Sequence, residues 1–142
     1  MKFYRTKTKR LLGTSYSEVY KKAYALYKEI KKQTKRRPYV RSAYFNKEKV
    51  FLELYWRHLS QKNWRDRVRR IRYFSCAIEL IKHSSFDPES KDDPEHTSQI
   101  FHRFTGITPD GDMFRVQIKE DKRNRQKWLM SSFPIDASVV DN

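Results

Sequence analysis

The stretch that decides the expected fold is IFHRFTGI-TPDGD-MFRVQIKE at residues 100–120, continued by QKWLMSSF at residues 126–133. Its three runs, 100–107, 113–120 and 126–133, are rich in β-branched and aromatic residues, as strands are. Between the first two runs stands Pro109-Asp110-Gly111, which is typical of a type I turn closed by a glycine with positive φ. The pattern predicts an antiparallel meander over residues 98–134.

Helical spacing of apolar residues precedes this meander in four segments: 15–36, 46–59, 63–72 and 76–81. Ser15 and Glu18 have the spacing of a capping box, and Asn46 and Asn63 can cap the second and third helices. Pro38 disfavours helix in the residue before it, so the first helix should end near residue 36. Residues 38–45 should be extended and residues 84–97 should form a loop.

The order of these elements, helices first and strands afterwards, predicts an α+β domain. We expect an N-terminal helical layer packed on a small antiparallel meander of three to four strands. Residues 1–14 are expected to form a basic flexible arm and residues 15–142 a single domain. Within that domain, residues 15–83 would be the helical basic half and residues 98–134 the sheet.

Basic charge is concentrated in the first half of the chain. Residues 1–75 hold 23 of the 32 Lys and Arg residues and only five acids, whereas residues 76–142 hold nine basic residues and twelve acids. A one-sided basic surface is the usual footprint of a polyanion, most often a nucleic acid. The expected partner is therefore a nucleic acid, with a membrane surface ranked below it. We take RNA as the partner, and the sequence does not distinguish it from DNA.

Composition excludes several other classes. The 142 residues suit one domain, and the three glycines stand apart, so no phosphate-binding glycine loop is present. A single cysteine, Cys76, fits a reducing cytoplasm, and no apolar run is long enough for a signal peptide or a membrane span. The histidines share no metal-ligand spacing, so we expect neither a metal nor a cofactor.

Five arginines within eight residues are candidates for nucleic-acid binding: Arg65, Arg67, Arg69, Arg70 and Arg72. The planar guanidinium group binds phosphate through two parallel hydrogen bonds. The alternative is a structural face of ion pairs, although few acids are close in the sequence. Arg103 and Arg115, on the expected strands, are further candidates for the same role.

Metal-free cleavage of RNA needs a base for the ribose 2′-hydroxyl, cations for the phosphate and an acid for the leaving oxygen. The candidate catalytic residues on the meander are His102, Lys119, Lys127, Ser131 and Ser132. The alternative for a strand histidine is a structural hydrogen bond. A three-residue turn places His102 opposite Ile118, and a shift by one residue places it opposite Lys119. Trp128 either stacks on a base or lies in the core.

The segments His102–Ile107, Asp110–Gly111, Phe114–Glu120 and Gln126–Pro134 resemble the phage-type branch of the barnase/EndoU/colicin/RelE-like nuclease superfamily. The segment 38–81 resembles uncharacterised proteins of mobile elements. The superfamily resemblance implies a helical layer before a four-stranded antiparallel sheet, and metal-independent ribonuclease activity of toxins. By position, His102 would match the general acid or base, Lys119 and Lys127 the phosphate-stabilising cations, and Ser131 or Ser132 the hydroxyl of the last strand.

The leading expectation is thus a cytoplasmic ribonuclease of toxin type, with RNA bound on the arginine-rich helix and cut at the sheet. The alternative is a non-catalytic nucleic-acid-binding accessory protein of a mobile element. An acidic partner such as an antitoxin is compatible with the first reading, because such inhibitors cover basic active sites.

Overall fold

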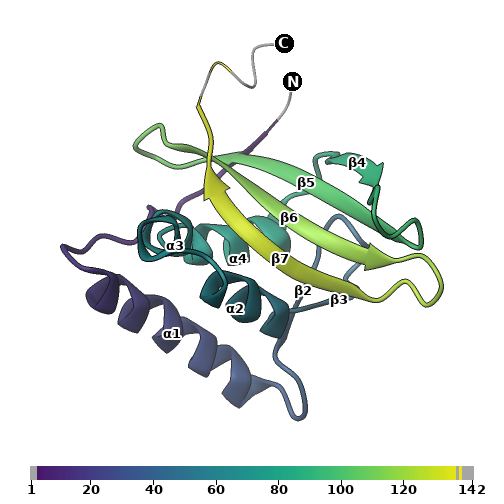
Figure 1. Ribbon diagram of the computed structural model, residues 1–142, viewed down its shortest axis with the longest axis horizontal. Helices are drawn as coiled ribbons and strands as arrows, with labels where there is room; N and C mark the ends of the chain where they lie inside the picture. Colours follow the sequence, from purple (N-terminus) through teal and green to yellow (C-terminus); the bar gives the residue numbers. More distant parts are fainter. Residues whose placement is uncertain (1–2, 137, 139–142) are drawn as a thin grey trace.

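A mixed sheet of seven strands forms the centre of the computed structural model, which describes residues 3–136 and 138 (Figure 1). The strands follow the order β1-β5-β6-β7-β3-β2, and β4 also pairs with β5. Their bounds are β1 Tyr4–Arg5, β2 Tyr39–Arg41, β3 Lys49–Phe51, β4 Glu89–Asp92, β5 Gln99–Ile107, β6 Met113–Asp121 and β7 Lys127–Pro134. The β1–β5 and β3–β7 pairs are parallel and the others antiparallel, and the sheet curves into a half-barrel.

The expected helical layer on a small antiparallel meander is therefore wrong. The half of the chain expected to be helical also supplies β2 and β3, and β3 pairs with β7. Lys49–Phe51 was expected within a helix, but it forms hydrogen bonds to two neighbouring strands instead. β2 lies within residues 38–45, which were expected to be extended. β3 was missed because a strand of three residues is too short to show a period of two in the sequence.

The turn expected at Pro109–Gly111 joins β5 and β6 into a long hairpin. Thr108 N–H donates to the Asp112 carbonyl at 2.9 Å, and Gly111 has φ of 88°. This three-residue turn places His102 opposite Ile118, which is the first of the two registers considered. A bulge between Gln117 and Ile118 then shifts the pairing of β6 with β7.

Four helices lie on one side of the sheet (Figure 1): α1 Tyr16–Gln33, α2 Glu53–Ser60, α3 Trp64–Ile71 and α4 Phe74–His83. The Ser15 hydroxyl accepts from the Glu18 N–H at 3.3 Å, and the Asn63 side chain accepts from the Asp66 N–H at 3.0 Å. Asn46 caps no helix, because α2 begins only at Glu53. Among the described residues, no helix has the length and apolar character needed to cross a bilayer.

The hydrophobic core fills the space between the helices and the sheet. Tyr55 and Phe74 from the helices pack in the same cluster as Phe114 and Leu129 from the strands, and all four side chains are almost fully buried. Gly106 allows this packing, because a Cβ atom there would lie 2.5 Å from the Phe114 ring. One face of the sheet therefore packs against the helices and is shielded from water. We call it the dry face.

The described part of the expected arm, residues 3–14, lies against the domain. Glu79 on α4 accepts hydrogen bonds from the Tyr4 hydroxyl at 2.8 Å and from the Lys7 and Thr8 N–H groups at 2.8 and 2.9 Å. Arg72 donates to the carbonyls of Leu11 and Gly13. Burial alone would raise the pKa of Glu79, but the hydrogen bonds from Thr8, Lys7 and Tyr4 hold it below its ordinary value.

We expect Glu79→Gln to release residues 4–8 from the domain, because an amide replaces the carboxylate that accepts these bonds. Tryptic cleavage after Lys7 or Lys9 should accelerate several-fold, and Glu29→Gln on the exposed side of α1 is the control. Since the pKa of Glu79 is lowered in the folded protein, the wild-type arm should stay protected at neutral pH. Its protection should be lost as the pH falls through that lowered pKa. Equal cleavage rates for both variants at neutral pH would contradict this role.

Candidate functional site

Alternation of side chains divides the long strands between two faces of the sheet. On β5, His102 and Phe104 face the helices, whereas Arg103 lies on the opposite face. We call this opposite side the open face, because its side chains are mostly half-buried and no helix covers it (Figure 1). The candidate residues therefore do not form one site: His102, Lys127 and Ser132 face inward, and Arg103, Arg115, Lys119 and Ser131 face outward.

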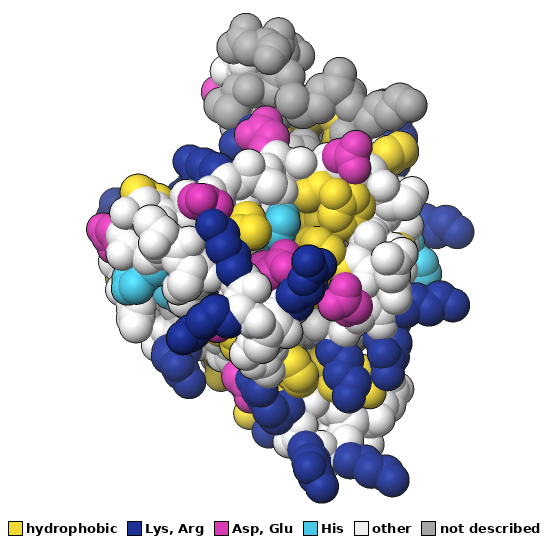
Figure 2. Space-filling model, turned by 90° about the vertical axis from the view of Figure 1, so that its right-hand side faces the viewer, with side chains coloured by type: hydrophobic (Ala, Val, Ile, Leu, Met, Phe, Trp, Pro, Cys, Tyr) yellow, Lys and Arg dark blue, Asp and Glu magenta, His cyan; other side chains and the backbone are white. Residues whose placement is uncertain are grey.

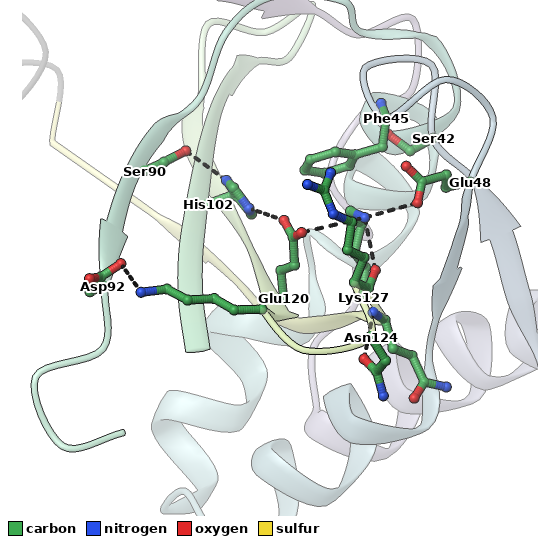
Figure 3. Close-up of polar contacts among 12 residues, drawn as sticks. Ser42, Phe45, Glu48, Ser90, Asp92, His102, Glu120, Asn124 and Lys127 are labelled. Atoms are coloured by element: carbon green, nitrogen blue, oxygen red, sulfur yellow. Dashed lines mark hydrogen bonds and ion pairs between the residues drawn. The ribbon is translucent and has the colours of Figure 1, made fainter. Parts of the chain in front are cut away.

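Two of the inward residues, His102 and Lys127, belong to a polar network, shown in Figure 3. Glu120 Oε1 lies 2.7 Å from His102 Nε2, and the Ser90 hydroxyl lies 2.6 Å from His102 Nδ1. Lys127 Nζ donates to Glu48 Oε2 at 3.0 Å and lies 3.8 Å from Glu120 Oε2. The network joins β4, β5, β6 and β7 to the loop between β2 and β3.

This network suits a structural role better than a catalytic one. Both ring nitrogens of His102 are engaged, and the Lys127 side chain is only 2% exposed. The Phe45 ring covers both groups, with its centroid 4.8 Å from Lys127 Nζ and 5.0 Å from the His102 centroid. Ser132 is fully buried and bonds to the Tyr55 hydroxyl at 3.0 Å, so it also belongs to the core.

The open face brings cations and aromatic rings together. Arg103 Nε donates to Gln117 Oε1 at 2.8 Å, and Gln117 itself is 7% exposed, so it orients the guanidinium group. Lys119 Nζ lies 6.0 Å from the centroid of the Trp128 ring on β7. The bulge brings Met130 to the same face, where its sulfur lies 3.2 Å from Gln117 Nε2.

His58, on α2, also lies on this face, and it was not among the site residues expected from the sequence. A groove of about 540 Å³ is lined by His58 together with Phe101, Arg103, Lys119 and Met130. Burial lowers the pKa of His58, and the positive charges of Lys119, Lys62 and Arg57 lower it further. Within the described residues the His58 ring makes no hydrogen bond, so a neutral imidazole is available to a ligand at neutral pH.

A second histidine lines the same groove. His96 is exposed on the loop before β5, and its Nδ1 lies 3.5 Å from Asp93 Oδ2. No three His, Cys, Asp or Glu side chains lie close enough to share a metal ion within residues 3–136 and 138. Two histidines and three cations (Lys91, Arg103 and Lys119) line this groove together with Asp93 and Glu95. Histidine side chains in such a groove can act as general acids and bases.

The five arginines of residues 65–72 serve several separate contacts. Arg69 and Arg70 each donate to Asp66 at 3.0 Å, and Arg67 donates to the carbonyls of Ser60 and Lys62 at 2.7 Å. Arg72 holds the N-terminal segment, as described above. Arg65 makes no ion pair among the described residues, and its guanidinium carbon lies 5.5 Å from the Trp64 ring centroid. The side chain of Arg115, on the open face, is only 11% exposed, and its Nη2 atom lies 3.8 Å from Glu89 Oε1.

The strand residues of this site could have been grouped from the sequence alone. The period of two along residues 113–120 puts Arg115, Gln117 and Lys119 on one face of a strand. Nothing local in the sequence joins His58 to that face, because the contact depends on how α2 packs against β7. No protein-family model matches the chain, and neither the curated proteins nor the solved structures contain a significant match.

We expect Lys127→Ala to destabilise the protein by about 3–5 kcal/mol, because it leaves Glu120 buried without its cation. Lys122→Ala is the matched control, since its ion pair with Asp92 is exposed to solvent. That control should change the free energy of unfolding by about 1 kcal/mol or less. Urea denaturation measures both, and equal stability of the two variants would contradict the structural role of the network.

Proposed function

We propose that this protein is a metal-independent ribonuclease whose substrate lies on the open face of the sheet. The observation that carries the proposal is the position of His58. A histidine with a lowered pKa shares a groove with Arg103 and Lys119, whose charges suit a phosphate. A base that is neutral at neutral pH, beside cations that bind phosphate, is what cleavage of RNA without metal requires.

In the proposed reaction, His58 accepts the proton of the ribose 2′-hydroxyl, and the 2′-oxygen attacks the adjacent phosphorus. Arg103 and Lys119 stabilise the negative charge that builds up on the pentacovalent phosphate. The bond from phosphorus to the 5′-oxygen breaks, and that oxygen takes a proton from His96. The products are a 2′,3′-cyclic phosphate and a free 5′-hydroxyl. Gln117 is a positioning residue, because it orients the Arg103 guanidinium group.

This assignment differs from the sequence expectation in the residue that acts as the base. His102 stays a candidate only if the network of Figure 3 opens to admit substrate, because both of its ring nitrogens are bonded. The second candidate function is non-catalytic RNA binding. Aromatic and cationic side chains alternate on the open face, and this favours binding without catalysis. Stacking and charge can hold a nucleic acid without any proton transfer.

We predict that the wild-type protein cleaves total RNA in the presence of EDTA and leaves 2′,3′-cyclic phosphate ends. His58→Ala should lower the cleavage rate by roughly a hundredfold or more, because general base catalysis contributes about that much. His83→Ala, which removes an exposed histidine of α4, is the matched control and should cleave at the wild-type rate. Intact RNA that is still bound by the wild type would favour the non-catalytic function. Loss of cleavage in a folded His102→Ala, with His58→Ala active, would return the base to His102.

The pH dependence of cleavage provides a separate test of His58. The base must be neutral to act, so activity should fall only below pH 6.5, the ordinary pKa of histidine, since the pKa of His58 is lowered. Lys119→Gln removes one of the positive charges that lower this pKa, so the acid limb of the profile should move to higher pH. Lys21→Gln removes the same charge from α1, which lies away from the sheet in Figure 1, and should leave the limb in place. An unchanged limb in Lys119→Gln would contradict His58 as the base.

A further inference from the structure

A single row of side chains crosses six strands of the sheet on the open face. Cross-strand partners point to the same side of a sheet, so the register identifies the members of the row. From β4 to β2 they are Lys91, Phe101, Lys119, Trp128, Phe51 and Tyr39. Their strand neighbours Val40, Val50 and Leu129 are buried, whereas the members of the row are half-buried or exposed.

The row continues beyond the His58 groove onto the β2–β3 hairpin. Phe51 pairs with Trp128, and the Phe51 and Tyr39 ring centroids lie 6.1 Å apart in an edge-to-face arrangement. Strands lie about 4.8 Å apart, so the whole row is about 24 Å long. At about 3.4 Å or more per nucleotide, that length suits about four to seven nucleotides.

Cations surround the two rings of the hairpin. The Arg37 guanidinium carbon lies 4.1 Å from the Phe51 ring centroid, and Lys49 Nζ lies 4.7 Å from that of Tyr39. Lys35 and Arg36 line the same groove of about 560 Å³. The carboxylate of Glu53 pairs with Arg37 and holds it in place over the ring. Figure 2 shows this end of the molecule, where Lys and Arg side chains gather in the lower half of the view.

A third groove joins the hairpin to the His58 groove. Its lining includes Arg37, Arg57, Lys119 and Trp128, and its volume is about 350 Å³. It shares Arg37 with the hairpin groove and Lys119 with the His58 groove. The three grooves therefore form one basic track that follows the aromatic row across the sheet.

We propose that the β2–β3 hairpin, with Arg37, is a second binding subsite that holds a single-stranded part of the RNA next to the cleavage groove. Bases stack on Phe51 and Tyr39, and the phosphates lie against Arg37 and Lys49. The occupant is single-stranded because bases in a duplex are already stacked and paired, and cannot lie on an aromatic side chain. This inference rests on the proposed function, since it extends the path of the same substrate.

The test measures binding of 2′-O-methyl RNA, which has no free 2′-hydroxyl and therefore cannot be cleaved by the proposed reaction. Affinity is compared for oligonucleotides of about four and about twelve nucleotides. The wild type should bind the longer one more tightly. A Phe51→Ala/Tyr39→Ala variant should lose at least about tenfold in affinity for it, given the usual contribution of base stacking. Phe86→Ala, an exposed phenylalanine before β4, is the control and should bind like the wild type.

A Lys49→Gln/Arg36→Gln variant tests the cations of the subsite while keeping both aromatic side chains, because the two replaced side chains are exposed. It should weaken binding of the longer oligonucleotide and reduce the dependence of affinity on salt concentration. Wild-type affinity in both hairpin variants, from a protein that cleaves RNA, would overturn the subsite and leave the proposed function standing. Equal affinity for a duplex of the same length would overturn the single-stranded assignment. A wild type that neither binds nor cleaves RNA would overturn both proposals.

Discussion

The alternation of side chains across one continuous sheet is the constraint on which the rest of this structure depends. Because β5, β6 and β7 pair over almost their full lengths, each residue of these strands belongs either to the dry face or to the open face. A buried charge on the dry face needs a partner of opposite charge, and Lys127 has two, the exposed Glu48 and the buried Glu120. On the open face, Arg115 pairs with Glu89, whereas Lys119 makes no ion pair among the described residues. The same strands therefore hold the core together on one side and present a cation, Lys119, on the other.

The basic half of the chain serves two physical purposes. Arg67 and Arg72 bind backbone carbonyls and so hold the connections between segments, as the five donors of a guanidinium group allow. Exposed cations that line a groove come from other places, such as Arg36 after α1 and Lys49 on β3. Several arginines of this helix therefore make structural contacts, and their density in the sequence does not by itself identify a binding surface. The grooves that several cations line lie where separate elements meet.

The two histidines near the sheet differ in chemistry because their surroundings differ. His102 is held between Ser90 and Glu120, so its nitrogens are already used for hydrogen bonds that stabilise the fold. His58 is partly desolvated and lies near Lys119, so its neutral form is favoured and its nitrogens are free within the described residues. The residue type alone therefore does not distinguish His58, the base that we propose, from the hydrogen-bonded His102. The His58 ring makes no hydrogen bond within the described residues, which favours it as the base. Both ring nitrogens of His102 are bonded, which argues against that role.

Features that depend on near neighbours could be predicted from the sequence. They are the cap at Ser15, the cap at Asn63 and the turn at Pro109–Gly111. The sequence left two registers of the hairpin open, and the structure shows the one that pairs His102 with Ile118. Only the tertiary structure decided that Phe51 lies beside Trp128 and that His58 reaches the open face. These contacts join segments far apart in the chain through strands of three residues and the packing of a short helix. Such pairings depend on the summed burial and hydrogen bonding of the whole domain, which leaves no periodic signal in a local stretch of sequence.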